Sequence, residues 1–139
     1  MLLSGEDYKT YLRLFNKASR NQDDWNVINS LLLKSDLVYA ITEGPDGKMD
    51  QNNTTIVSVD NYVPVYTSME DAKKGFKEIE AELKRQYKSI KLKTGSFVDL
   101  ARWVDKAGFT LIIDPNRGGR SITYTKRRIE LCLMLPWKI

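Results

Sequence analysis

Hydrophobic positions in the first quarter of the chain repeat with the period of an α-helix. Apolar side chains recur every three or four positions through residues 8–18 and again through residues 25–32. Asp23 stands just before the second run, where it could cap a helix. This spacing gives each helix one apolar face, so we expect a short helical hairpin that turns near Asn21 and Gln22.

Shorter runs rich in β-branched and aromatic residues predict strands further along the chain. They cover residues 37–42, 54–59, 62–66, 89–94, 109–113 and 121–124. Pro64 has no backbone N–H to donate, so its strand should lie at a sheet edge or contain a bulge. The run 109–113 is almost wholly apolar, which favours a central place in the sheet.

Three further helices are predicted among these strands. The longest begins near residue 67 and continues to about residue 90, with capping spacings at Thr67–Glu70 and at Ser68–Asp71. Another begins at Ser96 and stops at Gly108, and the last covers residues 126–133. The fold class is therefore α+β: a mixed β-sheet of about five to six strands with helices packed on it, preceded by the helical hairpin.

Length and composition agree with one domain over residues 1–139. Of the 139 residues 42% are hydrophobic and 29% charged, as in ordinary globular domains. Cys132 is the single cysteine, so no internal disulfide forms, and its apolar surroundings in sequence predict a buried, unreactive thiol.

No run reaches the roughly 20 apolar residues of a membrane span, and no signal-peptide pattern begins the chain. We expect a cytoplasmic protein without membrane contact.

Charge is unevenly distributed along the chain. Residues 1–70 carry 6 Lys and Arg against 10 Asp and Glu, whereas residues 71–139 carry 16 against 8. This asymmetry is compatible with two opposed faces for different partners. It is equally compatible with two halves that interleave in the fold.

The sequence contains no histidine. This excludes Ser-His-Asp and Cys-His nucleophile arrangements and most zinc sites. Glu78, Glu80 and Glu82 alternate along the long predicted helix and so spread over different faces, which is typical of a solvated surface. We therefore expect no catalytic residue, no metal site and no cofactor, and a protein that is not an enzyme.

A basic cluster marks the last third of the sequence. Its members are Arg117, Arg120, Lys126, Arg127 and Arg128. Tyr124 and Trp137 lie nearby in sequence, and basic residues beside aromatic ones can bind nucleic acid through phosphate contacts and stacking. Nucleic-acid binding through this basic C-terminal third is one functional interpretation, although no RNA- or DNA-binding motif accompanies it.

Three segments resemble parts of the N-terminal domain of the bacterial SseB family, the enhanced serine sensitivity proteins. They are residues 35–40 (SDLVYA), 63–70 (VPVYTSME) and 110–115 (TLIIDP). Asp114 stands where the third family segment has an asparagine, and the loop at 43–53 is longer than in the family. The resemblance covers about residues 22–133.

This resemblance implies a mixed sheet with packed helices and an interaction module without an established active site. Related single-domain proteins act as immunity factors against bacterial secreted toxins. By that analogy we expect a non-enzymatic protein-binding domain, an immunity protein that neutralises a cognate toxin or effector by covering its active site. Nucleic acid is the alternative partner.

Two segments are candidates for the contact with such a partner. The first is the loop of residues 44–53, which carries Asp46 and Asp50 against Lys48 and follows Glu43; loops on a rigid scaffold often bind. A solvated hairpin tip without a function fits this segment as well. The basic cluster is the second candidate segment. The candidate partner-binding residues are Glu43, Asp46, Asp50, Arg117, Arg120 and Arg127.

Overall fold

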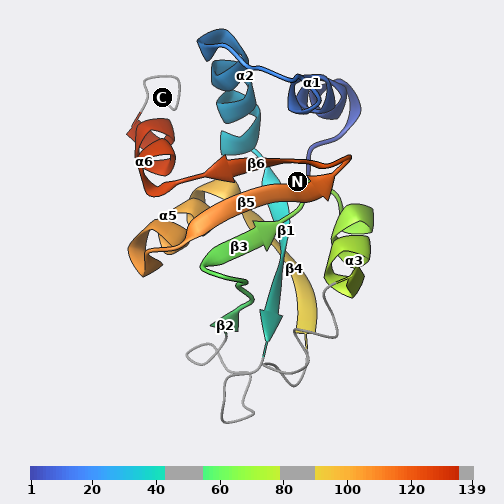
Figure 1. The fold of residues 1–139 in the computed structure, drawn as a ribbon, viewed down its shortest axis with the longest axis vertical. Coiled ribbons are helices and arrows are strands. Elements are labelled where there is room, and N and C mark those ends of the chain that lie inside the picture. Colours follow the sequence, from blue (N-terminus) through green and yellow to red (C-terminus); the bar gives the residue numbers. More distant parts are fainter. Residues whose placement is uncertain (43–54, 79–89, 135–139) are drawn as a thin grey trace.

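The computed structural model describes residues 1–42, 55–78 and 90–134 (Figure 1). Along the chain it has helices and strands in this order: α1 Gly5–Phe15, α2 Gln22–Leu33, β1 Asp36–Thr42, β2 Thr55–Ile56, β3 Tyr62–Val65, α3 Met69–Glu78, β4 Ile90–Ser96, α5 Phe97–Ala107, β5 Thr110–Arg117, β6 Arg120–Tyr124 and α6 Lys126–Met134. The α+β class and the N-terminal helical hairpin agree with the sequence prediction. Residues 43–54 and the part of the long predicted helix after Glu78 lie outside the described ranges.

The prediction of one sheet with five to six strands is wrong. The strands form two three-stranded sheets, an antiparallel one in the order β2-β1-β4 and a mixed one in the order β3-β5-β6. One edge of β1 pairs with β4 along its whole length. The other edge of β1 pairs with two different segments of the chain. Ile41 and Thr42 pair with β2 on that edge, whereas only Val38 reaches the second sheet, through two 2.8 Å backbone hydrogen bonds with Tyr66. One residue pair is too little to extend a continuous ladder, so the sheets remain distinct.

The strand β5 lies at the centre of the second sheet. It pairs in parallel with β3 and antiparallel with β6, which confirms the central position expected of its apolar run. β3 pairs with β5 alone among the described strands of this sheet, so Pro64 lies on an edge strand. There its missing N–H interrupts no ladder.

Two apolar clusters hold the layers together. In the larger one, α1, α2, α5 and α6 cover one face of β3-β5-β6, with Tyr11, Phe97 and Tyr124 fully buried. In the smaller one, α3 packs on β1, and Phe76 of α3 contacts the ring of Tyr66, which directly follows β3. Figure 1 shows α3 on its own beside β1 and β4, away from the other four helices.

The helix ends follow local capping rules. Ser96 accepts a hydrogen bond from the Asp99 N–H at 3.1 Å, and Gly108 ends α5 in the left-handed region at φ 78°, both as predicted. Ser68 caps α3 by accepting from the Asp71 N–H at 3.1 Å. Thr67, the other candidate, instead contacts Asp114, as described below.

The residue that caps the start of helix α2 is Asn21, two residues before Asp23, the predicted cap. Asn21 accepts a hydrogen bond from the Asp24 N–H at 2.8 Å, and Asp24 accepts one from the Asn21 N–H at 3.1 Å. This reciprocal capping box satisfies two N–H groups, which a cap at Asp23 does not offer.

The acidic and basic halves of the sequence interleave. Strand β1 of the acidic half pairs with β4 of the basic half, and β3 pairs with β5 in the same way. The pairing favours the second interpretation of the charge asymmetry, since neither half forms a sheet of its own.

Candidate functional site

Asp114 is a buried carboxylate at the point where β5 leaves the core. It is 1% exposed and lies in the left-handed region at φ 50°. The Thr67 N–H and hydroxyl donate to it at 2.9 and 2.7 Å, and the Tyr11 hydroxyl donates at 2.9 Å. The carboxylate thus joins α1, the start of α3 and β5 in one hydrogen-bonded cluster.

Burial sets the protonation behaviour of this cluster. Burial raises the pKa of the Asp114 carboxyl above its ordinary value, while the hydrogen bonds from Thr67 and Tyr11 oppose the shift. Burial also raises the pKa of Tyr11 well above its ordinary value, so its hydroxyl remains a donor. The cluster is internal and fully hydrogen-bonded, which suits a structural support better than a reacting group.

A hollow of about 440 Å³ lies directly outside this cluster, between α3 and the end of β5 from Asp114 to Arg117. A second hollow of about 260 Å³ adjoins it along the outer face of β3 and β5. Tyr66, Gly75, Glu78, Pro115 and Asn116 line both. We call the two hollows together the α3 groove.

The inner wall of the α3 groove depends on Gly75. A Cβ atom at this position would overlap the Tyr66 hydroxyl, so only glycine lets α3 approach the tyrosine ring. Burial raises the pKa of Tyr66 to about 12, which keeps the hydroxyl uncharged. At the far end, the Tyr62 side chain of β3 is exposed and adds an aromatic surface.

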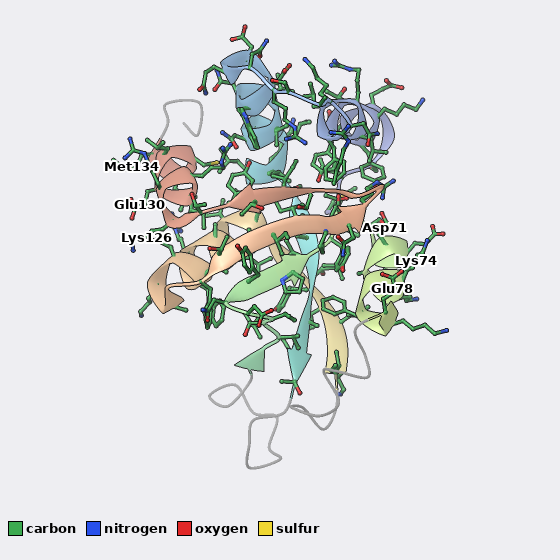
Figure 2. The ribbon with its side chains drawn as sticks, in the orientation of Figure 1. Asp71, Lys74, Glu78, Lys126, Glu130 and Met134 are labelled. Atoms are coloured by element: carbon green, nitrogen blue, oxygen red, sulfur yellow. The ribbon has the colours of Figure 1, made fainter. Side chains whose placement is uncertain are left out.

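Charged side chains of both signs line the outer rim. Asp71, Lys74 and Glu78 follow one another along α3 (Figure 2). Arg117 forms an ion pair with Asp71, and each of the two side chains remains 33% exposed. The rim therefore offers alternating charge beside an aromatic wall.

The structure separates the basic residues that the sequence placed together. Arg117 lines the α3 groove. Arg120 is its pairing partner across the β5–β6 hairpin. Arg120 is exposed and donates to the Lys17 carbonyl at 3.2 Å. Arg127 lies on α6, beyond the other end of β6, in a cleft against α2. Because β6 spans about 13 Å between these ends, the three arginines do not form one cluster.

The acidic candidates Glu43, Asp46 and Asp50 lie outside the described residues. Sequence reasoning missed Asp114, Tyr66 and Gly75 as parts of a site. An aspartate directly after a buried apolar strand was visible in the sequence, but its partner Thr67 is 47 residues away. The pattern contains no information on that pairing.

Over residues 1–42, 55–78 and 90–134, no group of three or more Asp, Glu, Cys or His residues has the arrangement of a metal site. Within the same ranges no helix has the length and apolar character needed to cross a membrane.

No protein-family model, no curated protein sequence and no solved structure matches this chain. The resemblance to the SseB family therefore stays a prediction.

Proposed function

We propose that this protein is a non-enzymatic binding protein whose partner is another protein, held in the α3 groove. The observation that carries the proposal is the exposed Tyr62, 43% accessible, beside a rim of alternating charges. Protein interfaces combine aromatic centres with polar rims in this way. Tyrosine is also enriched among the residues that contribute most to binding energy.

The resemblance to SseB-family immunity factors suggests the kind of partner. We propose a cognate bacterial toxin or secreted effector, neutralised when its active site is covered. The ion pair between Asp71 and Arg117 supports this model, because two half-exposed charges of opposite sign can both turn toward complementary charges on a partner. Such rim charges mainly set the association rate and the choice of partner.

Affinity capture from the native cell extract, with mass spectrometry, tests the proposal. We expect one protein to be recovered in stoichiometric amount, and the Tyr62→Ala variant to bind it about 30-fold more weakly, as for a strong interface tyrosine. Trp103→Ala is the matched control, because Trp103 is a similarly exposed aromatic (38%) that lies on α5. Recovery of no stoichiometric protein, or equal losses in both variants, contradicts the proposal.

A second pair of variants tests the rim. Lys74 lines the α3 groove, whereas Lys73 next to it is exposed and lines neither hollow. Lys74→Glu should change the association rate with the captured protein and its dependence on salt, and Lys73→Glu should change both much less. Identical kinetics for the two variants place the contact elsewhere on the surface.

A further inference from the structure

A separate cleft of about 530 Å³ lies between α2 and α6. Figure 1 shows the two helices on the same side of β6, near the end from which α6 continues. None of the residues that line this cleft lines the α3 groove. Its volume is within the range of small-molecule sites, about 300–1,000 Å³.

The cleft has a buried floor and an open rim. Asn29 and Cys132, 6% and 1% exposed, lie at the floor, and Leu131, 53% exposed, stands at the rim. The Tyr124 hydroxyl donates to the Asn29 side-chain oxygen, so the amide nitrogen of Asn29 is the group left to donate to a ligand. The walls therefore combine apolar contact with hydrogen-bonding groups.

The described residues give the cleft a positive charge. Arg127 and Arg128 line it, and none of the lining residues in the described ranges is acidic. Within the described part of the chain neither guanidinium has an ion-pair partner, in contrast to Lys126, which contacts Asp105 and Glu130 at 3.4 and 3.8 Å. Lys126 and Glu130 lie on the outer side of α6, turned away from the cleft (Figure 2).

Trp25 fixes one of these arginines. The Arg128 guanidinium lies 3.8 Å from the centroid of the indole ring, a cation–π distance. Arg20 lies 5.2 Å from the same ring and donates to the carbonyls of Leu14 and Phe15, at 2.9 and 2.7 Å. Burial lowers the pKa of Arg20, and the nearby positive charges of Arg120 and Arg128 act in the same direction. Because these contacts hold Arg20 and Arg128 in place, the two cations attract an anion at a lower cost of ordering than free side chains would.

We propose that this cleft binds a small organic anion in which a short aliphatic linker joins a carboxylate to a flat apolar group. The guanidinium groups of Arg127 and Arg128 receive the carboxylate, since arginine pairs with carboxylates through two parallel hydrogen bonds. Trp25 and Leu131 contact the apolar part, and Asn29 and Thr125 supply hydrogen bonds. The site is independent of the proposed protein partner, because the two surfaces share no residue.

Titration calorimetry of the full chain with 4-phenylbutyrate tests the site, with the uncharged 4-phenylbutyramide as the matched ligand. The acid should bind and the amide should bind at least about tenfold more weakly, the factor of one charge-assisted hydrogen bond. Equal affinity for the two compounds overturns the proposal, because the apolar walls of the cleft alone would then account for binding. Absence of heat for the acid at millimolar concentration overturns it as well.

Substitutions test whether the acid binds in the cleft or is merely attracted by the net positive charge of the protein. Arg127→Gln should weaken binding of the acid about tenfold, and Leu131→Asp, which places a carboxylate on an exposed rim position, should weaken it further. Lys126→Gln removes the same charge from the outer side of α6 and should leave the affinity unchanged. Equal losses in Arg127→Gln and Lys126→Gln overturn the assignment to the cleft, whatever the acid and amide show.

Discussion

The Tyr11 hydroxyl donates a 2.9 Å hydrogen bond to the buried carboxylate of Asp114, which lies 103 residues further along the chain. This contact attaches the N-terminal helical hairpin to the point where β5 leaves the core. The same carboxylate receives the N–H and the hydroxyl of Thr67, directly before α3. Asp114 thus determines how two helices meet at the base of the α3 groove.

Replacement of this carboxylate should be costly to stability. In Asp114→Asn the side-chain amide brings a second donor toward the hydroxyls of Tyr11 and Thr67, so a buried donor loses its acceptor. We expect the free energy of unfolding in urea to fall by about 2 kcal/mol. Tyr11→Phe removes only one bond and should cost about 1 kcal/mol. A smaller loss for Asp114→Asn than for Tyr11→Phe contradicts the central place of the carboxylate.

Stability should depend on pH through the same group. Because the pKa of Asp114 is raised in the folded state, the folded protein binds this proton more tightly than the unfolded chain does. The contribution of Asp114 to stability is therefore largest below its ordinary pKa and declines as pH rises through the folded-state pKa. Urea unfolding at a series of pH values should show this decline in the wild type, relative to Asp114→Asn. Parallel pH curves for the two proteins exclude the raised pKa.

Gly75 should not tolerate even a methyl group. A Cβ atom there would overlap Tyr66, and overpacking of this kind costs about 1–3 kcal/mol, more than the gain of about 1 kcal/mol in helix propensity. Gly75→Ala should therefore lower the midpoint of thermal unfolding. In a Tyr66→Leu background the same change should cost less, and Lys77→Ala, on the exposed side of α3, should change little. An equal cost in both backgrounds would place the strain elsewhere.

The end of α5 depends on the left-handed conformation of Gly108. No atom lies within 4 Å of a Cβ built there, so the cost of Gly108→Ala is conformational, about 1–2 kcal/mol. Gly108→Asn should cost less, because asparagine adopts this region more readily. Chemical denaturation of the three proteins gives the order; alanine at least as stable as asparagine contradicts the explanation.

Local signals in the sequence predicted local structure well. Ser96 and Gly108 fixed both ends of α5, and the apolar run before Asp114 indicated a central strand. The division into two sheets was not predictable, because it depends on how β1 shares one edge between β2 and the single residue Tyr66. Such long-range register is absent from the hydrophobic pattern.

In the candidate site, too, the sequence indicated individual residues but not the contacts between residues far apart along the chain. Arg117 was singled out from its basic surroundings, but its ion-pair partner Asp71 lies 46 residues earlier. Arg127 belongs to a different cleft from Arg117 although both stood in one basic cluster of the sequence. Position along the chain misleads here because β6 and the start of α6 lie between the two arginines.

The interleaving of the two halves also governs the order in which the chain acquires its structure during synthesis. The apolar faces of α1 and α2 are made first, yet they pack against β5 and β6, which are made after more than 100 residues. The nascent hairpin therefore emerges from the ribosome without the surface that covers Tyr11, Phe15 and Leu32. Until β5 and β6 have also emerged, those side chains are available to chaperones or to other nascent chains.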